Sequence, residues 1–266
     1  MGIITISRGS YSRGIEIAQK LADKLGYECI SREVLLKASK DFNVPETELM
    51  HAIHDAPSIF DRIKDGKKNY VAFIREAFLE HIQKDNIIYH GLAGHFFTKG
   101  IPNILKIRIT ADIKYRTNVV MIRDNVSEEK ALEIINNIDA ERSKWSTQLY
   151  GIDARSAELY DVVLHINCLE VDGIVDILYD LAQRPCFQTT PESKRKLKDM
   201  LIAAKAHLTV VDKYPEAIVK CKDGSVLITV ESSLSIEKKL SKKFNNLIKD
   251  IDGVKEVKTF VIPFET

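Results

Sequence analysis

A loop near the N-terminus, residues 8–14, carries the residue types best suited to chemistry. A short apolar run precedes it and a helical pattern follows it. In a loop of the form G-x-x-x-x-G-K-[ST], backbone N–H groups at a helix N-terminus surround phosphate oxygens, the lysine neutralises their charge and the Ser/Thr binds Mg²⁺. Gly9 and Gly14 have the required spacing, but Ile15 and Glu16 follow in place of Lys and Ser/Thr.

The loop keeps the small residues that a backbone phosphate site needs, but it lacks the positive charge of the usual lysine. Small residues allow the backbone to approach a ligand closely, and the loop has four of them: Gly9, Ser10, Ser12 and Gly14. Arginine can hold phosphate through two parallel hydrogen bonds, so Arg13, and after it Arg8, are the candidates to replace the lysine. Glu16 would repel a phosphate unless a metal ion lies between them. The alternative is an ordinary strand-to-helix turn with solvated arginines.

The elements that must position this loop form an alternating series. Apolar β runs alternate with helical patterns through residue 184, and the runs lie at 2–6, 27–30, 86–90, 104–110 and 160–166. Such runs, separated by helices, are typical of parallel strands buried on both faces. The sequence therefore predicts a doubly wound α/β domain with a parallel five-stranded sheet. Two long helical insertions, suited to lids, follow the second and fourth runs, and Ser127 is the expected N-cap of a helix in the later one.

The pattern changes near residue 185. Thr190 and Pro191 open a basic amphipathic helix, and Asp223-Gly224 marks a hairpin between two alternating runs. A second helix ends near Gly253, and a last strand follows. The order α-β-β-α-β predicts a small, separate α+β domain over residues 191–266.

The composition indicates a soluble globular protein. The 266 residues are 45% hydrophobic and 29% charged, with a net charge of +1, so nucleic acid is not expected as a partner. No apolar stretch reaches the length of a membrane span. The four cysteines are scattered without Cys/His metal spacing, so we expect reduced thiols, no set of protein metal ligands and a cytoplasmic location.

Several stretches spread over residues 1–184 resemble the cytidylate kinase-like family. They are Ile6-Ser7-Arg8 with the loop, Ser31-Arg32-Glu33, "IIYHGLAGHFF", the segment 109–145 and "YDVVLHINCLEVDGIVDIL". The resemblance implies a P-loop nucleoside monophosphate kinase domain over residues 1–186, with ATP and Mg²⁺ as cofactors and a lid near 139–150. The sequence departs from the family at the missing loop lysine and at Ser31, where the usual "DRE" has its aspartate.

The resemblance also implies roles on the donor side. The loop would hold the donor phosphates, with Arg13 as a catalytic cation. Arg142 and Lys144 would come from the lid and neutralise charge during transfer, and Arg116 would lie against the donor base. Each has a plainer alternative, since Arg142 could pair with Asp139 on an exposed helix and Arg116 could be a helix-surface residue.

Acceptor-binding residues are expected after the second and third β runs, because open α/β sheets bind ligands at the carboxyl ends of their strands. Arg32 would hold the acceptor phosphate, and His90 and Gly91 would form a wall of the site. A half-buried histidine with its hydrogen bonds satisfied is the alternative for His90. Trp145, the only tryptophan, is expected to pack at the lid hinge.

The tail, residues 191–266, resembles a BON-type domain, which implies binding of ligands, surfaces or further copies of itself. The whole chain is thus predicted to be a phosphotransferase that resembles nucleoside monophosphate (cytidylate) kinases, with ATP–Mg²⁺ as donor and a nucleotide-like acceptor. The alternative is a non-catalytic nucleotide- or phosphate-binding sensor or scaffold. Expected partners are nucleotides and, through a homodimer or assembly by the BON-like tail, other copies of the chain.

Overall fold

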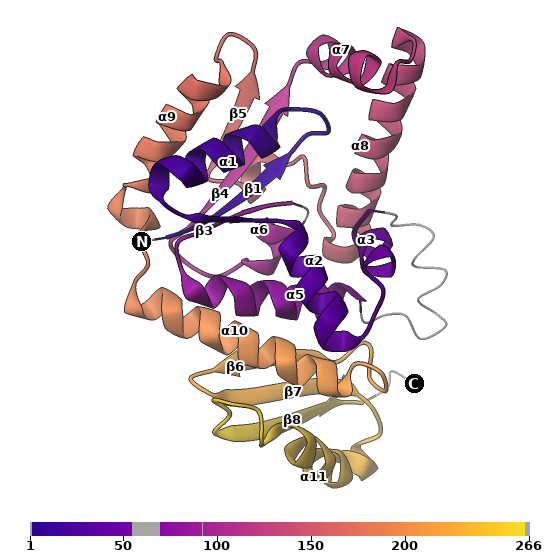
Figure 1. The fold of residues 1–266 in the computed structure, drawn as a ribbon. Helices are drawn as coiled ribbons and strands as arrows, with labels where there is room; N and C mark the ends of the chain where they lie inside the picture. The colour runs from indigo at the N-terminus through magenta and orange to yellow at the C-terminus, as the bar shows by residue number, and fades with distance from the viewer. Residues whose placement is uncertain (1, 55–69, 92, 264–266) are drawn as a thin grey trace. The chain divides into compact units, whose positions relative to one another are not determined.

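The computed structural model describes residues 2–54, 70–91 and 93–263, and its ribbon is drawn in Figure 1. The described chain forms two compact units. The first contains residues 2–33, 50–54, 84–91 and 93–190, and the second contains residues 34–49, 70–83 and 191–263. The predicted domain ranges, 1–186 and 191–266, stay a prediction.

The first unit is built on a five-stranded parallel sheet. Its strands follow the order β2-β3-β1-β4-β5, and each neighbouring pair is parallel. The predicted doubly wound α/β architecture is therefore confirmed, with every strand close to the β run that predicted it. The strands are β1 (Ile3–Arg8), β2 (Glu28–Ile30), β3 (Ile87–His90), β4 (Ile104–Ala111) and β5 (Val162–Ile166).

Helices of the first unit pack around this sheet (Figure 1). Helices α1 and α9 pack against each other and bury alternate strand residues, including Ile6 and Ile107, in the main core. Among the described residues, no helix has the length and apolar character needed to cross a membrane. The helices are α1 (Gly14–Leu25), α6 (Gly94–Phe97), α7 (Ile113–Asp124), α8 (Glu128–Tyr150) and α9 (Val171–Ala182), with short 3₁₀ turns at Ala157–Leu159 and Pro185–Phe187.

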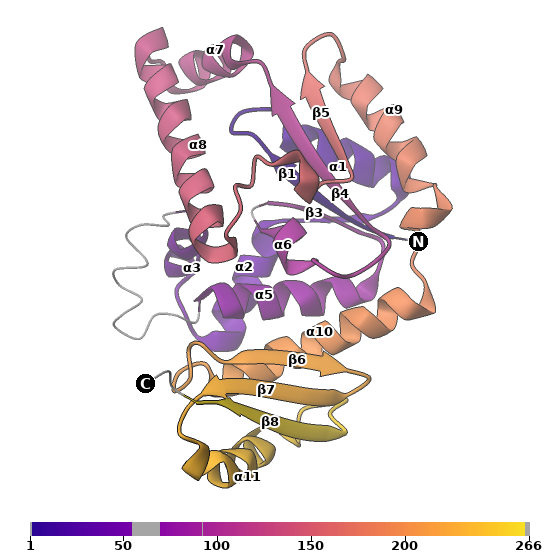
Figure 2. The ribbon, with the colours of Figure 1, turned by 180° about the vertical axis from the view of Figure 1, so that it is seen from behind.

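The second unit contains a three-stranded sheet in the order β6-β7-β8, with β7 in the middle (Figure 2). Strands β6 and β7 form an antiparallel hairpin at the predicted Asp223-Gly224 turn, and β8 is parallel to β7. The predicted α-β-β-α-β order is confirmed. The elements are α10 (Pro191–Val210), β6 (Ile218–Lys222), β7 (Ser225–Glu231), a 3₁₀ turn (Leu234–Ile236), α11 (Glu237–Ile248) and β8 (Glu256–Ile262).

Helical residues from the first lid-like insertion also belong to the second unit. Helix α5 packs on α10, which was not anticipated from the order of elements along the chain. The insertion's helices are α2 (Arg32–Phe42), α3 (Glu46–His54) and α5 (Tyr70–His81), and a 3₁₀ turn follows at Ile82–Lys84. The first residues of α2, the last residues of α3 and the end of the 3₁₀ turn belong to the first unit.

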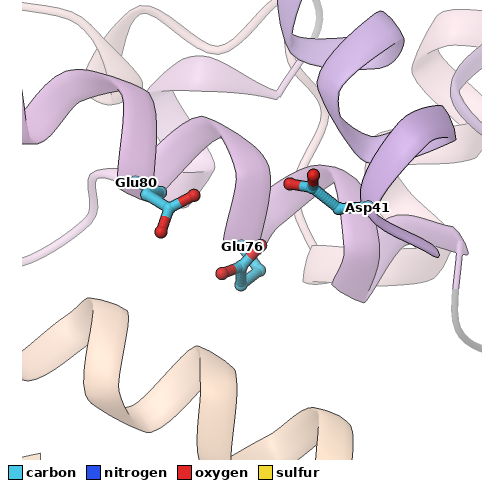
Figure 3. A group of neighbouring side chains, drawn as sticks. All are labelled: Asp41, Glu76 and Glu80. Atoms are coloured by element: carbon cyan, nitrogen blue, oxygen red, sulfur yellow. The ribbon is translucent and has the colours of Figure 1, made fainter. Parts of the chain in front are cut away.

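An ion network joins α2, α5 and α10. Carboxylate oxygens of Asp41, Glu76 and Glu80 lie within 4.8 Å of one another (Figure 3). Lys37 Nζ lies 2.6 Å from both Asp41 and Glu80, and Lys205 Nζ lies 2.9 Å from Glu80 and 3.7 Å from Glu76. Burial is the main cause that raises the pKa of Glu76. Because two lysines pair with these three carboxylates, the cluster is an ion-paired contact between helices.

Candidate functional site

The turn between β1 and α1 is shaped by hydrogen bonds to β4. Gly9 N donates to Ile109 O at 2.8 Å, and the buried Ser12 hydroxyl donates to Gly9 O at 2.9 Å. Gly14 begins α1 beside the Arg8 side chain, and a Cβ at Gly14 would lie 2.8 Å from Arg8 Cβ. The second glycine of the spaced pair is therefore needed because the side chain of Arg8 passes directly across it.

The Arg8 side chain is largely buried beneath this turn. Its Nε atom is inaccessible and makes no hydrogen bond. No carboxylate among the described residues pairs with its guanidinium, and burial lowers its pKa. A buried cation without a counter-charge is costly, and such groups are usually paired or await a ligand. Arg8 therefore marks a place where an anion would be strongly favoured.

A second such cation comes from α8. Arg142 Nη1 donates to Arg8 O at 3.1 Å, while Arg142 Nε is also buried without a hydrogen bond. Burial, followed by repulsion from Arg8, lowers the pKa of Arg142 to about 10. The plainer alternative for this residue, a pair with Asp139 on an exposed helix, is not what the structure contains. Arg8 and Arg142 together concentrate positive charge at the loop.

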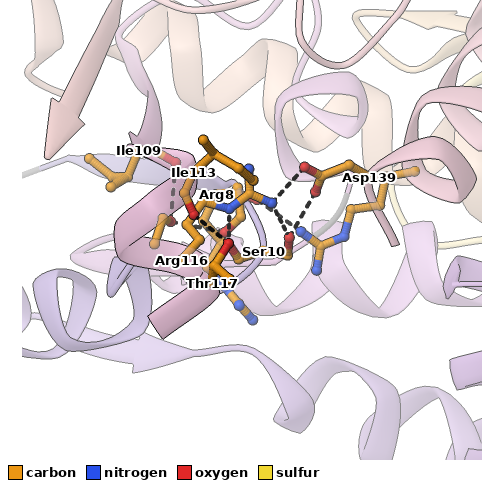
Figure 4. Close-up of polar contacts among 10 residues, drawn as sticks. Arg8, Ser10, Ile109, Ile113, Arg116, Thr117 and Asp139 are labelled. Carbon is orange, nitrogen blue, oxygen red and sulfur yellow. Dashed lines mark hydrogen bonds and ion pairs between the residues drawn. The ribbon is translucent and has the colours of Figure 1, made fainter. Parts of the chain in front are cut away.

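Asp139 instead binds the loop and α7 (Figure 4). Its carboxylate accepts from the Ser10 hydroxyl at 2.8 Å and from Arg116 Nη2 at 2.6 Å. Arg116 Nε donates to Ser10 O at 2.8 Å, and its Nη2 also donates to Ser10 Oγ. Arg116 is thus held by the loop and by α8 in this structure. Sequence reasoning missed Asp139 as a site residue, because its partners lie 129 and 23 positions away.

Arg13 pairs with the carboxylate of Glu16, three positions along the chain. Its Nε and Nη2 atoms donate to the two carboxylate oxygens of Glu16 at 2.6 and 2.7 Å. Both side chains are more than one third exposed, and the hydrogen bond from Arg13 is the main cause that lowers the pKa of Glu16. The spacing of three positions could have revealed this pair in the sequence. The catalytic role assigned to Arg13 stays a prediction.

Arg8, Arg13 and Arg142 line an open pocket, here called the loop pocket. Its volume is ≈ 530 Å³, which falls within the range of small-molecule sites. Its lining consists of Arg8, residues 10–14 of the loop, Ile15 and Glu16 at the start of α1, and Arg123, Ile138 and Arg142; Gly9 is not part of it. Backbone groups at a helix N-terminus, beside two guanidinium groups that pair with no carboxylate of the described residues, are suited to binding phosphate.

The other predicted residues lie outside the lining of the loop pocket, and their roles stay predictions. His90 ends β3 with Nδ1 buried and without a hydrogen bond, and burial lowers its pKa to about 4. Gly91 packs against Tyr89, whose Oη would lie 2.6 Å from a Cβ there. Arg32 begins α2 as an exposed residue. Lys144 is exposed and lies 3.1 Å from Glu141.

Comparisons with known proteins agree with this architecture. The model of the cytidylate kinase-like family matches residues 3–167. A cytidylate kinase of Saccharolobus islandicus (strain L.S.2.15) is 27% identical over 202 residues, covering 74% of this chain and 99% of that protein. A cytidylate kinase of Ignicoccus hospitalis is 25% identical over 181 residues, covering 67% and 97%. A solved structure of an uncharacterized protein from Eubacterium ventriosum has a TM-score of 0.53 at 21% identity, covering 69% of this chain and 100% of that one; this likeness concerns the fold alone.

Proposed function

The chain belongs to the cytidylate kinase-like family, and on that premise we propose that it transfers the γ-phosphoryl group of ATP–Mg²⁺ to a nucleotide-like acceptor. The observation that carries the proposal is the pair of guanidinium groups of Arg8 and Arg142 beside a strand–loop–helix turn. Their Nε atoms are buried without hydrogen bonds, and neither group has a carboxylate partner among the described residues. Phosphoryl transfer requires mainly positioning and electrostatic stabilisation. The loop backbone and these two cations can supply both.

In this proposal Arg8 takes the place of the missing lysine. Its Nε atom is buried without a hydrogen bond and no carboxylate of the described residues pairs with its guanidinium, whereas Arg13 is exposed and already pairs with Glu16. Arg142 adds a second charge from α8, the helix that includes the expected lid. A phosphate that accepts hydrogen bonds from both arginines would satisfy their buried donors. Arg13 is the second candidate and is tested separately below.

The residues at the loop pocket fit a nucleotide-bound Mg²⁺. This ion is usually held by one or two carboxylates together with phosphate oxygens, and Glu16 is the carboxylate that lines the pocket. When bound, the ion would neutralise phosphate charge. Binding of the ion would replace the ion pair between Glu16 and Arg13. It would also remove the repulsion between the Glu16 carboxylate and phosphate.

The remaining assignments complete the proposal. Arg32, His90 and Gly91 are proposed to contact the acceptor at the carboxyl ends of β2 and β3, and Lys144 and Arg116 are proposed to act when the lid region closes on the donor. The tail is proposed to be a BON-like domain over residues 191–266 that mediates ligand binding or assembly, and the family domain is proposed to end near residue 186.

The test is formation of ADP from ATP and Mg²⁺ with a panel of nucleoside monophosphates. Turnover is expected with at least one acceptor and should be lost in Arg142→Met. The matched control is Lys130→Met on the same helix, since Lys130 is exposed and pairs only with the nearby Glu133 among the described residues. Tight ATP binding without turnover across the panel would favour the non-catalytic sensor. No binding of any nucleotide would refute both functions.

A further inference from the structure

We infer that one face of the three-stranded sheet in the second unit pairs with the same face of a second copy of this chain. Helices α10 and α11 cover the inward side of the sheet, where their apolar residues share one core with Ile228 of β7 and Val261 of β8. Strand residues point alternately to the two sides. The other side, here called the outer face, consists of every second residue from 218 to 222, from 225 to 231 and from 256 to 262. Figure 2 shows the three strands.

Large apolar side chains of the outer face are exposed to solvent. Ile218 and Phe260 are 55% and 56% exposed, and Leu227 and Ile262 are exposed as well. These residues are neighbours across the sheet, because Ile218 and Phe260 both pair with Thr229 in the central strand. A single exposed apolar residue is ordinary, whereas a contiguous group on one face marks an interaction surface.

The charges of the outer face differ in sign between its two ends. Toward the start of β7 lie Lys220, Lys222 and Lys258, and Glu231 ends the strand. Glu256 also lies at the basic end, where its carboxylate is 2.9 Å from Lys258 Nζ. A nucleic acid or an anionic membrane presents one sign of charge and would be repelled by Glu231. A protein surface with the opposite order of charges is a better match.

A second copy of the chain supplies the opposite order when it is turned end to end. Most homodimers have two-fold symmetry, in which the same surface of each copy meets the other. The axis would lie in the plane of the contact and cross β7 near Ile228. The strand register then places Lys258 over the partner's Phe260, where an ammonium group is attracted to the ring. It also brings Lys222 beside the partner's Glu231, so that opposite charges meet.

The outer face is a better contact than the edges of the sheet. The edge strands β6 and β8 carry the exposed lysines Lys220 and Lys258, and lysines on an edge disfavour pairing with a further strand. Three strands that are about 4.8 Å apart and seven residues long cover roughly 300 Å². This is less than the roughly 800 Å² that each partner buries in a standard interface. We therefore expect a weak dimer that dissociates on dilution.

Sedimentation equilibrium of the full chain without nucleotide tests the inference. Wild type should change from monomer to dimer between about 10 μM and about 1 mM. Phe260→Lys removes apolar area and opposes the partner's Lys258, so it should weaken dimerisation at least about tenfold. The matched control is Leu247→Lys, because Leu247 is an exposed residue of α11 and lies outside the outer face. It should change dimerisation less than about twofold.

A charge exchange separates a direct contact from a loss of folding. Glu231→Lys should weaken the dimer at least about threefold, because it brings like charges together. The double variant with Lys222→Glu should restore the affinity, which a merely misfolded variant would not do. Far-UV circular dichroism of each variant reports whether the fold is kept.

Three results would overturn the inference. They are a chain that stays monomeric at about 1 mM, a dimer that Leu247→Lys weakens as much as Phe260→Lys does, and a monomer that binds vesicles of anionic lipid more tightly after Glu231→Lys. The inference deepens the proposed role of the tail in assembly. It does not depend on phosphoryl transfer, and since sedimentation needs no nucleotide, the absence of a dimer and the absence of ADP formation are separate results.

Discussion

Replacing Arg142 by methionine should make the protein more stable while it weakens ATP binding. Burial lowers the pKa of Arg142 to about 10, well below the usual range of arginine, and a displacement of that size corresponds to about 3 kcal/mol against the charged side chain. Methionine keeps much of the volume and removes this cost. The lost hydrogen bond to Arg8 O is worth about 1 kcal/mol, so a net gain of about 1–2 kcal/mol is expected.

The same substitution removes charge-assisted hydrogen bonds to phosphate, each worth about 1.5–3 kcal/mol. ATP affinity should therefore fall about 10- to 100-fold. Urea unfolding followed by the fluorescence of Trp145, which is 2% exposed, measures stability, and titration with ATP–Mg²⁺ measures affinity. Lys130→Met should change neither by more than about 0.5 kcal/mol. A variant destabilised by more than about 1 kcal/mol would show that Arg142 is a structural residue and refute the reasoning.

Three further predictions concern groups around the site and the ion network. Asp139→Asn should lower the free energy of unfolding by about 1–3 kcal/mol, and a double-mutant cycle with Arg116→Met should give a coupling energy of about 1 kcal/mol or more. Additive effects of the two substitutions would contradict the contact between Asp139 and Arg116. Burial lowers the pKa of His95, which contacts Tyr160, to about 3. Because the unfolded chain takes up this proton below about pH 6.5, stability should fall by about 2 kcal/mol from pH 7 to 5, and His95→Gln should remove that part of the slope in urea unfolding. Lys205→Met should lower the urea midpoint more at pH 7 than at pH 5, because the raised pKa of Glu76 allows protonation to relieve its lost partner; an equal effect at both pH values would argue against the ion network.

Much of the fold could be predicted because its signals are local. Each strand of the first sheet lies in an apolar run, as burial on both faces requires. The Asp223-Gly224 turn has positive φ angles of 52° and 84°, which these residue types tolerate best. Ser127 caps α8 as expected, since its side chain accepts from Lys130 N. These features depend on neighbours a few positions apart.

The site was less predictable because its charges are set by distant contacts. Arg8 and Arg13 look alike in the sequence, but Arg8 is largely buried with no carboxylate partner in the part of the chain that the structure describes, whereas Arg13 pairs with Glu16. The partners of Asp139 come from β1–α1 and α7, so only the folded chain brings them together. Whether an arginine lacks a counter-charge depends on every segment that packs around it, and a linear motif does not contain that information.

Arg8, and not Arg13, is proposed to replace the lysine of a phosphate-binding loop. Steady-state ADP formation with ATP, Mg²⁺ and the best nucleoside monophosphate, compared between Arg8→Met and Arg13→Ala, tests it most directly. If Arg8 supplies this charge, turnover should fall at least 100-fold in Arg8→Met and less than tenfold in Arg13→Ala. Full activity in Arg8→Met, with activity lost in Arg13→Ala, would contradict it.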